Sequence, residues 1–275
     1  MGQASPNWHA SMTLRLGKAG RITKICGHES SGPLKIQRPF YPEGDLCHLY
    51  LLYPPGGLVG GDSLELDVTV DNGASTLITT PAATKFYRSN GLVATQVQKF
   101  QVGADASFEW LPQEVLLFGG SKGKSQTKIA LHKRSRFVSM ELFGLGRPAY
   151  GDHYQSGKYD QSLSVSIDGE PLVNERHRWS GRGDTLDGKW GMGKCAVFGA
   201  LHAGPVDNLD IQAFRQRLQF FDPGVWSVSC INSLFVARYL GNKTEEGLAL
   251  LRAAWREIRP MVIGRDSVWP RIWNT

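Results

Sequence analysis

Cysteine is scarce in this chain, and the four cysteines are not arranged for a disulfide framework or a metal cage. They are Cys26, Cys47, Cys195 and Cys230 in a chain of 275 residues, with no C-x-x-C pair among them. Small secreted domains normally carry a denser cysteine framework, and a structural zinc site needs closely spaced ligands. We therefore expect reduced thiols and a cytoplasmic protein.

Long apolar segments are also missing. The first twenty residues lack the apolar core of a secretion signal, and the run LYLLY stops at Pro54, well short of membrane-spanning length. The formal net charge is +6, but the lysines and arginines are scattered rather than clustered. This composition favours a soluble globular protein with neither a membrane nor a nucleic acid as its partner.

Familiar catalytic motifs are absent as well. The seven histidines form neither H-x-x-x-H nor H-E-x-x-H, and no G-x-S-x-G elbow occurs. The stretch YPPGGLVGGDSL, residues 53–64, has the glycine spacing of a phosphate-binding loop, but Asp62 stands where that loop requires lysine. A carboxylate would repel phosphate, so this stretch predicts a glycine turn rather than a nucleotide site.

Short alternating segments are what the sequence has in abundance. In residues 63–70 the apolar Leu64, Leu66, Val68 and Val70 alternate with polar residues, which predicts a half-buried strand. The DNG turn that follows and the segment ASTLITT suggest a returning hairpin strand. Similar short strands recur to about residue 205, without a repeat of fixed length. The pattern predicts a mainly β protein, an irregular many-stranded body of the sandwich or solenoid type.

Helical periodicity appears only near the C-terminus, and it predicts a pair of helices. Residues 211–218 carry one amphipathic stripe, and residues 244–258 carry a stronger one, with Thr244 as its cap and Pro260 as its stop. No linker separates the β-rich residues 1–205 from the helix-containing residues 206–275. We predict a single domain covering residues 1–275.

Seven segments resemble the urease accessory protein family UreD, also called UreH, and they keep the family's order along the chain. They are GPLKIQRPFYPEG (32–44), YPPGGLVGGDSL (53–64), TTPAATKFYRSNG (79–91), EWLPQEVLLF (109–118), GRPAYGDHY (146–154), ERHRW (175–179) and the closing IRPMVIGRDSVWPRIWNT. The resemblance implies a β-rich scaffold without catalytic activity. It also implies binding to apo-urease and to UreF-type and UreG-type partners, with nickel as transient cargo and no tightly bound cofactor.

The resemblance implies that three carboxylates lie along a path for nickel. They are Asp62 in the G-G-D motif, Glu175 in the E-R motif, and Asp152. Oxygen ligands suit a transfer path because they release a borderline cation more readily than a Cys/His cage does. The alternative is that the Asp62 and Glu175 carboxylates only accept backbone hydrogen bonds. Two positions differ from the common family pattern. In YPPGGLVGGDSL, Tyr53 stands where many family members have histidine. In GRPAYGDHY, Asp152 stands where glutamate is common.

The C-terminal tail is the predicted docking site for the UreF-type partner, through Trp269, Ile272 and Trp273. The alternative is that these residues pack against the body of their own chain. Two other functions remain open from the residues alone: a cytosolic β-rich enzyme acting on a carbohydrate, and a free-standing nickel-binding protein. Paired carboxylates on adjacent strands would serve the first of these functions.

Overall fold

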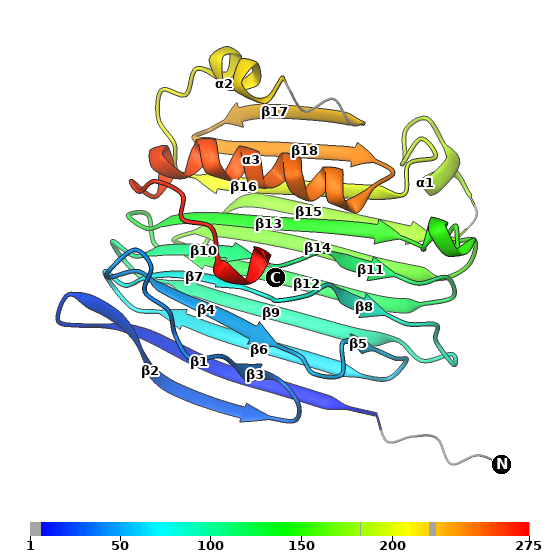
Figure 1. Cartoon of the computed structure of the whole chain (residues 1–275), viewed down its shortest axis with the longest axis horizontal. Coiled ribbons are helices and arrows are strands. Elements are labelled where there is room, and N and C mark those ends of the chain that lie inside the picture. The colour runs from blue at the N-terminus through cyan, green and yellow to red at the C-terminus, as the bar shows by residue number, and fades with distance from the viewer. Residues whose placement is uncertain (1–6, 182, 220–223, 275) are drawn as a thin grey trace.

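The computed structural model describes residues 7–181, 183–219 and 224–274, and it consists mainly of two large sheets lying face to face (Figure 1). Of the first twenty residues, which were considered above for a secretion signal, the structure therefore describes those from Asn7 onward. The first sheet has seven strands in the order β15 (Glu170–Ser180), β14 (Lys158–Ile167), β12 (Lys122–Leu131), β9 (Ala94–Val102), β6 (Ser63–Val70), β1 (His9–Ala19) and β2 (Ile22–Ser31).

The second sheet is larger, with eight strands along its main path and three short ones beside it. The main path is β17 (Val225–Ile231), β18 (Leu234–Gly241), β16 (Val197–Gly204), β13 (Arg136–Leu145), β10 (Ser107–Leu111), β7 (Ser75–Thr79), β4 (Cys47–Leu52) and β3 (Lys35–Ile36); the short strands are β5 (Gly57–Leu58), β8 (Thr84–Phe86) and β11 (Val115–Leu117).

The chain winds between the two sheets as a solenoid does. β6, β9, β12 and β14 follow one another in parallel in the first sheet, while β4, β7, β10 and β13 do the same in the second. The coils are unequal in length, since Ser63 pairs with Thr95, Ala94 with Gly123, and Lys122 with Lys158. This inequality explains why a solenoid-like body shows no sequence repeat of fixed length.

The alternation in 63–70 is confirmed, because Leu64, Leu66, Val68 and Val70 are all buried between the sheets. The hairpin predicted at the DNG turn is wrong. β6 pairs with β1 and β9, whereas β7 pairs with β4 and β10 in the opposite sheet. Turn residues show where a strand ends, but not whether the next strand pairs with it or crosses to another sheet.

Two helices cover the outer face of the second sheet, as the predicted pair does: α2 (Ile211–Leu218) and α3 (Thr244–Val262). α3 lies across β13, β16 and β18 (Figure 1), and its Leu251, Trp255 and Ile258 join a second hydrophobic core there. Two predictions for α3 are wrong. Lys243 rather than Thr244 is the N-cap residue, and the helix runs past Pro260 to Val262. A proline this close to the C-terminus removes only one helical hydrogen bond, so the last turn survives.

Residues 206–275 do more than supply these helices, because they also contribute β17 and β18 to the second sheet. The remaining helical segments are short: α1 (Asp184–Asp187) and the 3-10 turns Pro148–Tyr150 and Arg271–Asn274. Within the described residues, no helix is long and apolar enough to cross a membrane.

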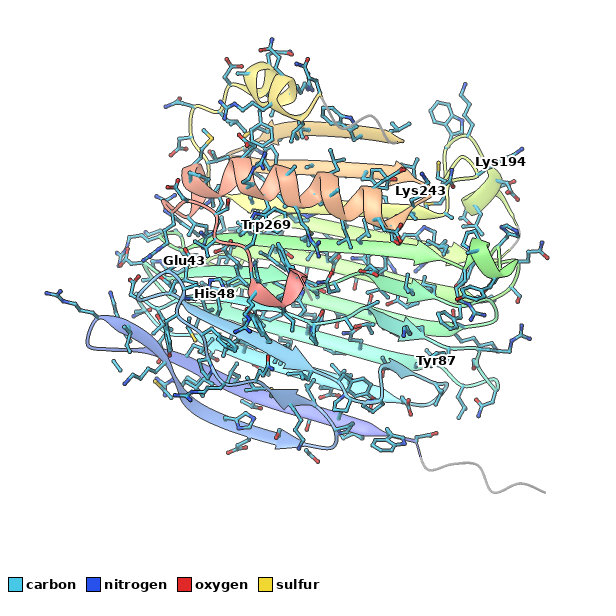
Figure 2. All side chains as sticks on the ribbon, viewed as in Figure 1. Glu43, His48, Tyr87, Lys194, Lys243 and Trp269 are labelled. Atoms are coloured by element: carbon cyan, nitrogen blue, oxygen red, sulfur yellow. The ribbon has the colours of Figure 1, made fainter. Side chains whose placement is uncertain are left out.

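A buried charge network joins α3 to the sheet beneath it. Arg259 is fully buried and contacts Glu109 of β10 at 2.8 Å and Glu43 at 2.9 Å. His48 lies 2.7 Å from Glu43, and Figure 2 shows both residues near the C-terminal end of α3. Burial would raise the pKa of Glu43, but His48 and Arg259 hold it below its usual value. Arg259 therefore anchors the helix and is not part of an exposed basic surface.

Candidate functional site: a polar row between the sheets

The space between the two sheets contains a row of polar side chains where apolar ones would be expected. On the inner face of the first sheet, Gln96 pairs across the ladder with Ser125, Ser125 with Gln161, and Gln161 with His177. One level further along the strands, Gln98 pairs with Thr127. Because the register places these residues side by side, the polar row crosses four strands at right angles to them.

Glu141 of β13 faces this row from the second sheet and lies at its centre. One carboxylate oxygen accepts a hydrogen bond from the Thr127 hydroxyl at 2.8 Å, and the other accepts one from the Gln161 amide at 2.6 Å. Thr127 also lies 3.1 Å from the Gln98 side-chain oxygen. Burial raises the pKa of Glu141 above its usual value. A buried carboxylate is costly to keep, so its position between two hydrogen-bond donors points to a role beyond packing.

Several atoms of the row have hydrogen-bonding capacity that no described protein group uses. They are the side-chain oxygens of Ser125, Ser139, Tyr159 and Gln161, and the Nε2 atoms of His177 and His202. Buried polar atoms are normally paired, so unpaired ones gathered in a single row are unusual.

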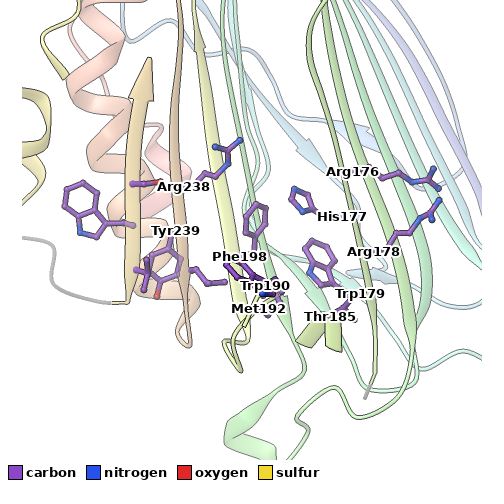
Figure 3. Close-up of a pocket in the computed structure, with 15 residues that line it drawn as sticks. Arg176, His177, Arg178, Trp179, Thr185, Trp190, Met192, Phe198, Arg238 and Tyr239 are labelled. Carbon is purple, nitrogen blue, oxygen red and sulfur yellow. The ribbon is translucent and has the colours of Figure 1, made fainter. Parts of the chain in front are cut away.

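Each end of the row meets a hollow. Gln96 and Gln98 line a small one together with Tyr53, Thr80 and Thr84. At the opposite end, a cleft of about 420 Å³ lies between the edge strand β15 and the strands β16 and β18. Figure 3 shows His177 and Trp179 directed into this cleft towards Phe198, with Arg238 entering from β18. The polar row thus has a hollow beside each of its two ends.

Glu175 lies at the cleft end of the row. Its Oε1 lies 3.3 Å from His202 Nε2 and also contacts Arg238, while its Oε2 lies 3.8 Å from His177 Nε2. Burial would raise the pKa of Glu175, but the neighbouring His177, His202 and Arg238 side chains hold it far below its usual value. Its partners are charged or titratable side chains rather than backbone groups.

Asp62 and Asp152 lie elsewhere, in loops at the ends of strands. Asp62 is buried and accepts hydrogen bonds from the backbone N–H groups of Trp8 and Val59, both at 2.9 Å. Burial, and after it the charge of Asp62, raise the pKa of Tyr53, a residue that lines the smaller hollow. Asp152 accepts a hydrogen bond from Gly119 N–H at 2.8 Å and lies 3.6 Å from Arg147.

The backbone contacts of Asp62 lead to a stability prediction. Asp62→Ala leaves two backbone N–H groups without partners, so we expect a loss of about 1–3 kcal/mol in the free energy of unfolding. Urea denaturation followed by tryptophan fluorescence measures this loss. Asp67→Ala on the outer face of β6, the strand that follows Asp62, is the control and should change little; an equal loss in both variants would contradict the structural role.

The tail residues differ in their surroundings. Trp273 is buried against Trp255 and donates a hydrogen bond from its ring nitrogen to Thr79 at 2.9 Å. Ile272 is half-buried, and Trp269 keeps 39% of its surface exposed. The tail thus packs on its own chain through Trp273 and presents Trp269 to the outside.

The sequence analysis named Glu175 as a candidate and did not name Glu141, Gln98, Thr127 or Gln161. For Gln98, Thr127 and Gln161 the available signal was phase, because each occupies an inward position of an alternating strand. Glu141 illustrates the difficulty, because its strand RFVSMELFGL is covered on both faces and shows no clear alternation. Only the placement of α3 tells which face of β13 looks towards the other sheet.

Sequence comparison with known proteins shows the family to which the chain belongs. The family profile described as UreD urease accessory protein matches residues 9–274. The chain is 41% identical to the urease accessory protein UreD of Alkalilimnicola ehrlichii, over 98% of this chain and 93% of that protein. It is 37% identical to the UreD protein of Pseudomonas entomophila, over 99% and 96% of the two chains. The chain therefore belongs to the UreD family of urease accessory proteins.

Proposed function

We propose that this chain is a non-catalytic cytoplasmic maturation factor that helps to deliver nickel to apo-urease. Membership of the family supports a role in urease maturation. The single observation that carries the nickel proposal is the polar row, which has Glu141 at its centre, Glu175 at one end and an opening beside each end. Carboxylate, amide and hydroxyl oxygens bind a borderline divalent cation weakly enough to release it.

In this proposal nickel enters at one hollow and leaves at the other, passing Gln98, Glu141 and Glu175. Asp62 near the smaller hollow contributes negative charge at that opening, because oppositely charged groups at a mouth raise the local cation concentration. Asp152 contributes to the path by fixing the neighbouring loop. Urease, a UreF-type protein and a UreG-type GTPase are the proposed partners, and the GTPase rather than this chain would hydrolyse nucleotide.

For the UreF-type partner we propose docking at the tail through Trp269 and Ile272. An exposed tryptophan on a tail anchored by Trp273 offers a rigid aromatic surface, which is typical of interface anchors. Trp273 supports this surface from below. Truncating the tail would remove a core residue, so a single substitution at Trp269 is the sharper test.

Co-expression tests both proposals in one experiment. A urease operon lacking its own UreD gene is expressed with and without this chain, and nickel per urease and urease activity are measured. We expect activity only with the chain present, and co-purification of the UreF-type partner that Trp269→Ser weakens. Unchanged nickel content on adding the chain would contradict the maturation role, and full retention of the partner by Trp269→Ser would contradict tail docking.

A further inference from the structure

Glu175, His177 and His202 form a compact group at the cleft end of the polar row. Glu175 and His177 are two residues apart on β15 and therefore share its inner face, while His202 reaches them from β16. His202 is 2% exposed, and its Nε2 atom faces the Glu175 carboxylate without forming a well-aligned hydrogen bond. The Nε2 atom of His177 is unpaired in the same way.

The spacing of these atoms suits a metal coordination shell. Nitrogen and oxygen ligands bind borderline divalent metals at about 2.0–2.2 Å, so neighbouring donor atoms of one shell lie about 3.0–3.5 Å apart. The separations of 3.3 Å and 3.8 Å between the Glu175 oxygens and the two Nε2 atoms are close to that range. Two imidazoles and one carboxylate are a donor set that nickel and zinc both accept.

Arg238 occupies the position where such a cation would act. Its guanidinium contacts Glu175 Oε1, the same oxygen that faces His202. No three potential ligand side chains among the described residues are grouped closely enough to hold a metal ion in this structure, in which Glu175 contacts Arg238 instead. Arg238 keeps 44% of its side chain exposed at the cleft, so it can turn out towards solvent without losing a buried position.

We propose that Glu175, His177 and His202 are the ligands of a transient divalent-cation site, and that Arg238 closes this site when no cation is bound. The guanidinium neutralises the Glu175 carboxylate, which would be costly to leave unpaired, and an arriving cation takes over that role. Competition with Arg238 weakens cation binding, as a transfer site requires. That the cation is nickel in transit rests on the function proposed above, whereas the site itself does not.

Nickel binding to the purified full-length chain tests this site without urease. Arg238→Gln removes the competing guanidinium, and we expect isothermal titration with Ni²⁺ to show about tenfold tighter binding, since a charged hydrogen bond no longer has to break. His177→Gln in the Arg238→Gln background should lose about tenfold or more of that affinity. His177 is the ligand to replace first because it is more exposed than His202.

Arg178→Gln is the matched control, because Arg178 lines the same cleft from β15 but pairs with Asp160. It removes the same charge and should leave nickel affinity unchanged. Equal tightening in both arginine variants would reduce the effect to general electrostatics and overturn the proposal. Unchanged affinity in Arg238→Gln, or in the His177→Gln combination, would also overturn it. Neither result would affect urease activation in the co-expression experiment. The proposed cation site and the proposed maturation role can therefore be rejected independently of each other.

Discussion

Glu141→Gln is expected to lower the nickel content of urease about tenfold in the co-expression assay while leaving the chain as stable as before or more so. The substitution keeps the shape of the side chain and one acceptor oxygen for Thr127 or Gln161, but it removes the negative charge at the centre of the polar row. A cation crossing that region would lose its strongest oxygen ligand.

Stability is expected to stay the same or rise, whereas nickel delivery is expected to fall. The two effects can therefore be separated. Burial raises the pKa of Glu141, so the folded state binds a proton more strongly than the unfolded state does. Folding stability contributed by this group therefore falls as the pH rises above the ordinary glutamate value, because ionising the side chain costs more in the folded state than in the unfolded state. A glutamine removes that cost, so a poorly folded protein would not explain a loss of nickel delivery.

Glu65→Gln is the matched control, since Glu65 is exposed on the outer face of the first sheet. It should leave urease nickel and unfolding unchanged. If Glu141→Gln delivers nickel as well as the wild type does, the interior row is not the path. A surface route along the partners would then be the better explanation.

Arg259→Met is expected to cost about 3–5 kcal/mol in the free energy of unfolding, the largest stability effect that we predict. Arg259 and Glu109 are both fully buried, and Glu109 also accepts a hydrogen bond from the Trp255 ring nitrogen at 2.7 Å. Removing the guanidinium leaves Glu109 as a buried charge without a cation and takes one neutralising partner from Glu43. Urea denaturation of the purified chain measures the loss.

Arg265→Met is the control for this prediction. Arg265 pairs with Asp45 at 2.8 Å, but both side chains are about one-third exposed, and exposed pairs contribute only about 0–1 kcal/mol. The double variant Arg259→Met, Glu109→Gln should recover part of the loss, because glutamine is uncharged and still accepts from Trp255. A loss below about 1 kcal/mol in Arg259→Met would show that water reaches the network.

Local patterns in the sequence were enough to predict the mainly β class, the strand at 63–70 and the two C-terminal helices. Each of these depends on neighbours within a few residues. Leu64 to Val70 lie on one face because a strand has a period of two, and the stripe ending at Ile258 lies on one face because a helix has a period of 3.6. Family resemblance supplied Glu175, since the E-R motif is visible without any knowledge of the fold.

The candidate site depends on contacts that no local pattern contains. Glu141 and Gln161 are twenty residues apart, and Glu175 and Arg238 are 63 apart. These residues come into contact because the coils have unequal lengths and because β13 pairs with β16. Both features depend on how the two sheets pack against each other. Arg259 shows the same limit. As a helix-terminal arginine it looks exposed, but tertiary packing places Glu109 beneath it.

By itself, the sequence determined the class of fold, the strand and helix segments, and the family, because period, turn chemistry and ordered motifs are properties of the chain alone. Only the tertiary structure decided that Asp62 ties backbone groups together while Glu141 and Glu175 share one interior row. The physical reason is that the role of an inward-facing polar side chain depends on the residues opposite it. Those residues are far away in the chain, and only the folded structure brings them into contact.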